Sequence, residues 1–262
     1  MRRAILIFSA VFITGCAGTG TSPTSSSSAI PVSEQMPTGI AEKSAKTHTE
    51  LGALYLEAGN FAVALEESRY AAATDPNYAP AYNLMGLVHL MLNETPQAKG
   101  AFERAIQLAP TDPQIANDYG WFLCVSGREQ EAFKYFETAT RNPLYRTPTR
   151  PYTNAGLCYL RIKDDKSAEM NFQRAVLLDG SNAQATYHLA SLSYKRGDYF
   201  NAKKLLGELH KLIEPNAESL WLGVRIERKI GDRQAEASYS SQLRRKFAGS
   251  PEHQALLQGK FE

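Results

Sequence analysis

The feature that most constrains the fold of this chain is a sequence period of about 34 residues. Small residues recur at matching offsets, since Gly86 is followed at +12 by Ala98 and Gly120 at the same offset by Ala132. One interval is longer by two residues, which lie in the stretch 143–151. A fixed period of this length is typical of stacked repeats, in which each unit buries its apolar face against its neighbours. The chain is therefore expected to fold as an elongated array.

Each repeat unit reads as a pair of helices. Two apolar segments of about a dozen residues, each with helical periodicity, are separated by a turn such as 126–128 or 196–199. Small residues on both helices allow the helix axes to approach closely. Phe102 and Phe136 are expected to fill the space between successive hairpins, and Pro110 to end a second helix. The pattern predicts one helical hairpin per repeat.

The spacing and residue types resemble the tetratricopeptide repeat (TPR) over about residues 45–249. The resemblance implies an all-α fold, an α-α superhelix or TPR solenoid of about six helical hairpins. A generic helical bundle with a chance period is the alternative. Residues 250–262 are expected to form a C-terminal tail. The six predicted repeats are 45–78, 79–112, 113–146, 149–182, 183–215 and 216–249.

The first sixteen residues have the order of a bacterial lipoprotein signal. Two arginines precede an apolar run over 4–13, which is too short to span a bilayer. The run ends in the tetrapeptide 13–16, Ile-Thr-Gly-Cys, which resembles a lipobox. The resemblance implies that 1–15 are a cleaved signal peptide, that Cys16 is acylated, and that the protein is anchored in the outer membrane, facing the periplasm. An ordinary cleaved signal with an incidental cysteine is the alternative.

Charge and composition narrow the classes of partner. The formal net charge is +2, from 29 basic and 27 acidic side chains. Two of the basic residues are in the predicted signal, so the expected mature charge is 27 − 27 = 0. This balance gives no electrostatic reason to expect a nucleic acid as partner. Residues 16–44 begin with the cysteine that is expected to be lipidated and are rich in Ser, Thr, Gly and Pro, which predicts a flexible tether.

The sequence contains no recognisable catalytic motif. Its histidines are scattered, and it has neither His-Glu-x-x-His nor a cysteine pair at zinc spacing. Gly-x-Ser-x-Gly and the phosphate-binding Gly-Lys-Ser/Thr loop are also missing. We therefore predict no catalytic residue, cofactor, metal site or small-molecule substrate. An envelope enzyme is the alternative from a different class.

In stacked hairpins of this kind, the first helix of each repeat faces the concave side. Positions +1, +4 and +5 from each small residue should then line a groove, and in repeats two to four these positions are mostly apolar. Such a groove suits an extended or helical peptide. The alternative is that several of these side chains pack between adjacent first helices. The predicted groove residues are Asn83, Leu87, Leu90, Met91, Asn117, Trp121, Val125, Leu157 and Leu160.

Two cysteines fall on the first helices of successive repeats. Cys124 and Cys158 are at +4 and +2 from the glycines of their repeats. At 100° per residue these offsets differ by about 200°, which places the two thiols on opposite faces. Since neighbouring helices meet through opposite faces, a disulfide is expected in an oxidising periplasm. The alternative is two buried thiols that act as small hydrophobic residues.

Some segments are more specific than the generic repeat. They are Asn-Asp-Tyr-Gly-Trp-Phe-Leu-Cys at 117–124, Asn-Ala-Gly-Leu-Cys at 154–158 and Leu-Trp-Leu-Gly-Val-Arg-Ile-Glu-Arg at 220–228. Together with 237–239 and 242–247, they resemble the PilW/PilF family of type IV pilus biogenesis lipoproteins. The likeness spans the lipobox and all six repeats.

This family resemblance implies a pilotin, an outer-membrane lipoprotein that helps the pilus secretin to localise or multimerise, or that stabilises assembled pili. The implied partners are the secretin and, through the lipid anchor, the outer membrane. Within the family the required step differs between organisms. The second interpretation is a TPR lipoprotein that serves as adaptor for another envelope machine, such as outer-membrane protein assembly or peptidoglycan hydrolases.

Overall fold

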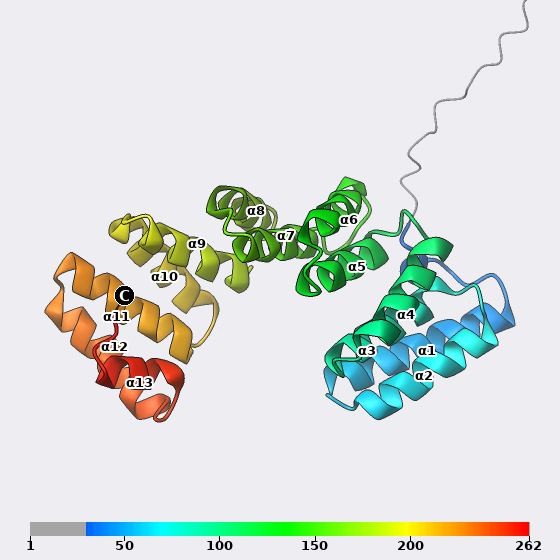
Figure 1. Cartoon of the computed structure of the whole chain (residues 1–262), viewed down its shortest axis with the longest axis horizontal. Helices are drawn as coiled ribbons and strands as arrows, with labels where there is room; N and C mark the ends of the chain where they lie inside the picture. The colour runs from blue at the N-terminus through cyan, green and yellow to red at the C-terminus, as the bar shows by residue number, and fades with distance from the viewer. Residues whose placement is uncertain (1–29, 262) are drawn as a thin grey trace, which may run out of the picture.

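The computed structural model describes residues 30–261, and the regular structure in this part of the chain is entirely helical (Figure 1). No helix among these residues has the length and apolarity needed to cross a bilayer. The predicted signal peptide 1–15 and Cys16 lie outside the described residues. The elements are η1 (Val32–Glu34), α1 (Ile40–Glu57), α2 (Phe61–Thr74), α3 (Ala79–Met91), α4 (Thr95–Leu108), α5 (Pro113–Val125), α6 (Glu129–Arg141), α7 (Thr149–Arg161), α8 (Asp165–Leu178), α9 (Ala183–Lys195), α10 (Tyr199–Leu212), α11 (Ala217–Ile230), α12 (Arg233–Lys246) and α13 (Pro251–Leu257).

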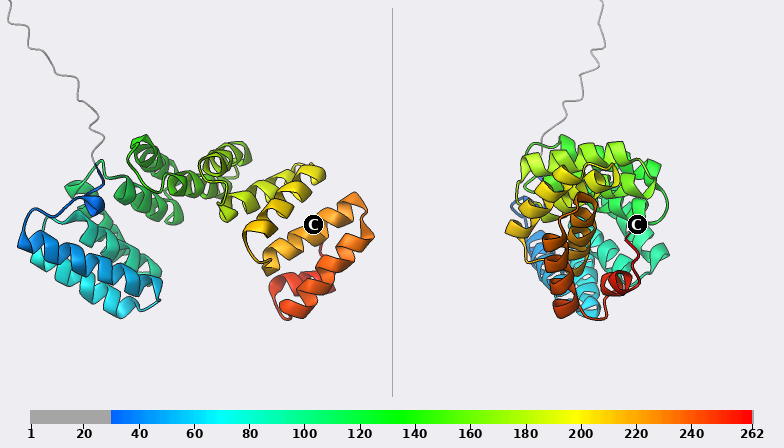
Figure 2. Two further views of the ribbon diagram at one scale, coloured as in Figure 1. Left: turned by 180° about the vertical axis from the view of Figure 1, so that it is seen from behind. Right: turned by 90° about the vertical axis from the view of Figure 1, so that its left-hand side faces the viewer.

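The helices form six antiparallel pairs that stack along the chain. Each odd-numbered helix from α1 to α11 packs on the helix that follows it, and each pair packs on the next pair. The stack bends into an arch, with α1–α4 at one end and α11–α13 at the other (Figure 1). The view from one end shows that the pairs also wind around the long axis (Figure 2). The predicted α-α superhelix of about six helical hairpins is confirmed.

The glycines that recur in the sequence period are in direct contact with the recurring aromatic rings. A β-carbon on Gly86 would lie 2.8 Å from the ring of Phe102, sixteen residues later in the same helix pair. Gly120 and Gly156 face Phe136 and Phe172 in the same way. The centroid of the Phe102 ring also lies 5.2 Å from that of Phe122 in the next pair. The Phe102 ring therefore joins the two helices of its own pair and also contacts the following pair, which fits the expected filling role of these phenylalanines.

The structure differs from the predicted tether at its C-terminal end. The tether was expected to extend to residue 44, whereas α1 begins at Ile40 and the residues before it pack against the helices. Val32 contacts two small apolar clusters, one containing Tyr78 and one containing Ile115. Its backbone N–H donates to Oδ2 of Asp112 at 2.7 Å. The ion pair of Glu34 with Arg146 at 2.7 Å and the hydrogen bond that Nζ of Lys46 donates to the carbonyl oxygen of Gln35 at 2.9 Å add to these contacts. The segment is thus held by single contacts that its polar composition does not reveal.

The C-terminal segment 250–262 also contains regular structure. Residues Pro251–Leu257 form α13, and the hydroxyl of Ser250 accepts a hydrogen bond from the N–H of His253 at 3.1 Å. Leu256 is buried in a cluster that includes Trp221. The short helix therefore packs against α11 and α12, on the last pair of the array.

Candidate functional site

The first helices of several pairs line one hollow of about 260 Å³ on the array. Its residues come from α3, α5, α7 and the start of α9, so it runs across the boundaries between repeats. Leu87 and Trp121 are its apolar residues. Its polar residues are Asp118, Thr149, Arg150, Thr153, Asn154, Asn182 and Gln184. The hollow combines a small apolar surface with many polar groups. Such a surface suits a peptide, whose apolar side chains can contact the first and whose backbone can form hydrogen bonds with the second.

The seven apolar residues of the predicted groove divide into two groups. Leu87 and Trp121 line this hollow together. The side chains of the second group do not line it, and most of them are half-buried against the cores of their pairs, as the packing alternative describes. Met91 is the exception in this group, because it is 56% exposed. The second group is Leu90, Met91, Val125, Leu157 and Leu160.

The two predicted asparagines lie in a chain of hydrogen bonds that links three first helices. Asn83 Nδ2 on α3 donates to Oδ2 of Asp118 on α5 at 2.8 Å, and Asn117 Nδ2 donates to Oδ1 of the same carboxylate at 2.9 Å. Asn154 Nδ2 on α7 donates to Oδ1 of Asn117 at 3.0 Å. Asn117 is fully buried. The structure thus uses these amides between helices, where they fix the spacing of α3, α5 and α7 beneath the hollow.

Asp118 is the buried charge at the centre of this network. Burial raises the pKa of its carboxyl, while Arg150 and the amides of Asn83 and Asn117 act in the opposite direction. Arg150 Nη2 lies 3.5 Å from Oδ1 of Asp118, and about half of the Arg150 side chain is exposed. A cationic group is therefore held at the mouth of the hollow by a buried carboxylate.

The sequence interpretation did not identify Asp118 or Arg150 as site residues. The sequence feature that could have identified Asp118 is the adjacent polar pair at 117–118 inside α5, because the other residues of this helix are mostly buried and apolar. Two neighbouring polar residues in such a helix need buried partners, because an unpaired polar group in a protein interior is costly.

A second hollow, of about 170 Å³, lies next to the first. Asn83 and Leu87 line it together with Ala53 on α1, Tyr78 before α3, and Ser33 on η1. Oδ1 of Asn83 is buried and has no hydrogen-bond partner within residues 30–261. This hollow continues the surface toward the first helix pair.

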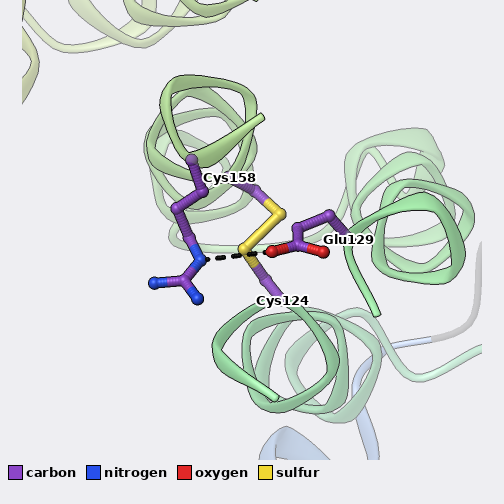
Figure 3. Close-up of a disulfide and its surroundings, with 4 residues drawn as sticks. Cys124, Glu129 and Cys158 are labelled. Carbon is purple, nitrogen blue, oxygen red and sulfur yellow. Dashed lines mark ion pairs between the residues drawn. A yellow bond between two sulfur atoms is a disulfide. The ribbon is translucent and has the colours of Figure 1, made fainter. Parts of the chain in front are cut away.

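The predicted cysteine pair joins two of the helices that line the first hollow. Cys124 on α5 and Cys158 on α7 form a disulfide, with their Cα atoms 5.9 Å apart and both side chains fully buried (Figure 3). That separation lies within the usual range for disulfides. Glu129 on α6 lies beside the bond and pairs with Arg161 at 3.5 Å (Figure 3). The covalent link therefore fixes α5 against α7 close to Trp121.

Residues 30–261 contain no cluster of three or more His, Cys, Asp or Glu side chains placed to hold a metal ion. The groups that line the first hollow are an indole, an aliphatic side chain, a guanidinium group, a carboxyl, and several amides and hydroxyls.

Comparisons with known proteins place this geometry in a family context. Tetratricopeptide-repeat family models match residues 49–113, 83–145 and 149–182. The type IV pilus assembly protein PilF of Pseudomonas aeruginosa is 28% identical over 257 residues, which is 97% of each chain. A solved structure of P. aeruginosa PilF matches with a TM-score of 0.76 and 28% identity, covering 84% of this chain and 99% of that one. A structure of PilW, a widely conserved type IV pilus biogenesis factor, matches with a TM-score of 0.75 and 27% identity, covering 81% of this chain and 98% of that one.

Proposed function

Because this chain is a tetratricopeptide-repeat protein of the PilW/PilF family, we propose that it acts in type IV pilus biogenesis as a scaffold that binds other envelope proteins. The observation that carries the proposal is the hollow shared by Leu87 and Trp121 across four first helices. The likeness to PilF and PilW supports the pilus process, and the hollow supplies a surface on which a protein segment can bind.

The specific partner that we propose is the pilus secretin. The protein acts as a pilotin: it binds a segment of the secretin subunit and promotes its localisation and multimerisation in the outer membrane, or it stabilises the assembled pilus. The PilW/PilF resemblance of segments 117–124 and 154–158 supports this role, and both segments contribute residues to the region around the hollow.

The hollow is suited to binding because it is rigid before a partner arrives. The amide and carboxylate network spaces α3, α5 and α7, and the disulfide joins α5 to α7. A rigid surface loses little conformational entropy on association, which leaves more of the contact energy for affinity. Trp and Arg are also the residue types most often found at energetic centres of interfaces. Trp121 and Arg150 are thus the proposed anchors for the secretin segment.

The proposed location follows from the lipobox resemblance at Cys16. Each buried methylene of an acyl chain contributes about 0.8 kcal/mol, so a multiply acylated cysteine gives stable attachment to the outer membrane. Attachment confines the scaffold to the surface where the secretin must assemble. Confinement raises the effective concentration of one partner near the other and favours ring formation without chemistry.

The test is secretin binding by full-length variants. Trp121→Ala should weaken binding by about 30-fold, since an interface tryptophan typically contributes about 2 kcal/mol or more. Met91→Ser is the matched control, because Met91 was also a predicted groove residue but lies outside the hollow, and it should change binding by less than about twofold. Helicity by circular dichroism must be unchanged in both variants.

Two results would contradict the proposal. Folded Trp121→Ala protein that binds secretin like the wild type would exclude the hollow as the recognition surface. Affinity capture from envelopes that returns outer-membrane assembly factors or peptidoglycan hydrolases in place of secretin would favour an adaptor for another machine.

A further inference from the structure

The last two helix pairs hold an aromatic side chain of the chain itself. Phe261, the last described residue, follows α13, and the end of the chain lies near α11 (Figure 1). Its ring centroid is 5.5 Å from that of Trp221 and 3.8 Å from the guanidinium carbon of Arg228. The hydroxyl of Tyr194 on α9 donates to the carbonyl oxygen of Phe261 at 3.4 Å. The segment therefore binds by a ring contact, a cation–π contact and a hydrogen bond to its backbone.

The side chains around Phe261 form what we call the aromatic cradle: Tyr194, Trp221, Arg225 and Arg228. The cradle is organised by its own contacts. The guanidinium carbon of Arg225 lies 5.0 Å from the ring centroid of Tyr194 and 5.7 Å from that of Trp221. Trp221 is buried in the core beside Leu243, and Arg228 pairs with Glu236 at 2.9 Å. None of these contacts involves Phe261.

Few polar contacts join the covering segment to the cradle. Gly259 has φ near 66° and turns the chain after α13, and Lys260 is exposed. Within residues 30–261, the hydrogen bond from Tyr194 is the only one that joins 259–261 to the cradle. A hydrogen bond contributes about 1 kcal/mol and an exposed cation–π contact about 0.5–1 kcal/mol. Phe261 also packs against the cluster that contains Trp221 and Leu256, and its ring is only half-buried. A ligand can therefore displace the segment if it supplies an aromatic ring to replace this packing.

The charges of the cradle do not match the segment that covers it. Arg225, Arg228 and Lys229 are close together on α11. Of these three cations, Arg228 forms an ion pair with Glu236. The segment adds a further positive charge, Lys260, beside Phe261. Nε of Arg225 is buried and has no hydrogen-bond partner within residues 30–261. An acidic residue next to an aromatic one would satisfy this guanidinium through a charge-assisted hydrogen bond.

We infer that the aromatic cradle is a second docking site, which binds a partner segment with an aromatic side chain beside acidic residues, and that Phe261 occupies it when this partner is absent. The cradle lies on α9 and α11, whereas Trp121 and the proposed secretin anchors lie on α5 and α7. The inference therefore holds or fails independently of the secretin proposal.

The test is an NMR titration of the full chain with a synthetic peptide, Gly-Ser-Gly-Glu-Phe-Glu-Gly-Ser, followed at the indole N–H signals. The chain has two tryptophans, so Trp121→Phe assigns both signals and Trp121 serves as an internal control. In the Phe261→Ala variant the Trp221 signal should shift and the Trp121 signal should not. The same peptide should bind wild type about tenfold more weakly if the tethered segment has an effective concentration of about 1 mM and a dissociation constant of about 0.1 mM for the cradle.

Two matched changes identify the recognised groups. A peptide with Ala in place of its Phe should not shift the Trp221 signal. In the Phe261→Ala background, Arg225→Gln should remove the preference for the Glu-flanked peptide over one flanked by Lys. Equal affinity of wild type and Phe261→Ala would show that the segment does not cover the site. No shift of the Trp221 signal at millimolar peptide, or a shift as large with the Ala peptide, would exclude the cradle as a docking site.

Discussion

Gly156 and Phe172 are in direct contact, and a β-carbon on Gly156 would lie 2.6 Å from Cε1 of the Phe172 ring. The two residues are on α7 and α8, so their contact sets how closely these helices approach. The same relationship recurs between Gly223 and Tyr239 in the last pair, where the hypothetical β-carbon lies 2.9 Å from the tyrosine ring. The contact therefore recurs even where the phenylalanine is replaced by another aromatic residue.

Gly156→Ala should destabilise the array. A side chain inserted into a well-packed interface forces atoms apart and typically costs about 1–3 kcal/mol. Gly207→Ala is the matched control, because nothing lies within 4 Å of a β-carbon there and the position is inside α10. That change should raise the free energy of unfolding by about 0.5–1 kcal/mol, the usual gain of Ala over Gly in a helix.

Urea denaturation followed by circular dichroism measures both changes. The two variants should differ in the sign of their effect on the free energy of unfolding. Equal destabilisation by the two alanines would show that the contact between Gly156 and Phe172 does not limit the approach of α7 and α8.

Reduction should lower the melting temperature of the oxidised protein. Cys124 and Cys158 close a loop of 34 residues, for which the chain-entropy model gives about 3–4 kcal/mol. The intact mass of protein made in an oxidising compartment should be about 2 Da below that of its reduced form. The double variant Cys124→Ala with Cys158→Ala is the control, and reductant should leave its melting temperature unchanged. Two free thiols at these positions after oxidative folding would exclude the bond.

Features that repeat along the chain could be predicted from the sequence. The spacing of Gly86 and Phe102 recurs in other copies, so many residues report the same helix pair. The disulfide partners were predicted from helix geometry, because Cys124 and Cys158 have different offsets in adjacent repeats. Because the same pattern occurs in several repeats, a substitution in one repeat does not prevent the helix pairs from being predicted.

Contacts made once could not be predicted in the same way. Whether Asn117 faces solvent or a neighbouring helix depends on how far α5 is rotated about its axis. The repeat pattern does not determine this rotation accurately enough to decide. Asp118 meets Arg150 across a 32-residue separation. Val32 on Asp112 and Phe261 on Trp221 are likewise single contacts of the chain's outer segments with the array. Within residues 30–261 none of these pairs recurs in another repeat, so no periodic signal indicates them.

The stability contributed by Asp118 should fall as pH rises. Burial raises the pKa of this carboxyl in the folded protein, so the folded state keeps the proton at pH values where the unfolded state has released it. The folded state then binds more protons than the unfolded state, and the free energy of unfolding decreases with pH over that interval. We therefore compare the free energy of unfolding of wild type with that of Asp118→Asn. The advantage of wild type should be largest below about pH 4 and should shrink above it.

Asp179→Asn is the matched control, and its pH dependence should have the opposite sign. The hydroxyl and backbone N–H of Ser181 lower the pKa of the exposed Asp179 carboxyl. A lowered pKa contributes stability above the ordinary pKa of aspartate and loses it as pH falls. Thermal melts of the three proteins between pH 3.5 and 7 measure both trends. Each variant is compared with wild type, and the difference in stability is plotted against pH. Slopes of the same sign for Asp118→Asn and Asp179→Asn would show that the pKa of Asp118 is not raised.

Membrane attachment is predicted to depend on one of the three cysteines. Cys16 ends the segment that resembles a lipobox, whereas Cys124 and Cys158 are fully buried in the array. Metabolic labelling with palmitate should therefore mark wild type and the Cys124→Ala, Cys158→Ala double variant, but not Cys16→Ala. The Cys16→Ala protein should keep its helicity, because the described α-helices begin at Ile40. It should no longer fractionate with the outer membrane, and cells that carry it should display fewer pili if the proposed role depends on confinement to that surface. Label on Cys16→Ala, or its absence from wild type, would contradict the lipoprotein interpretation.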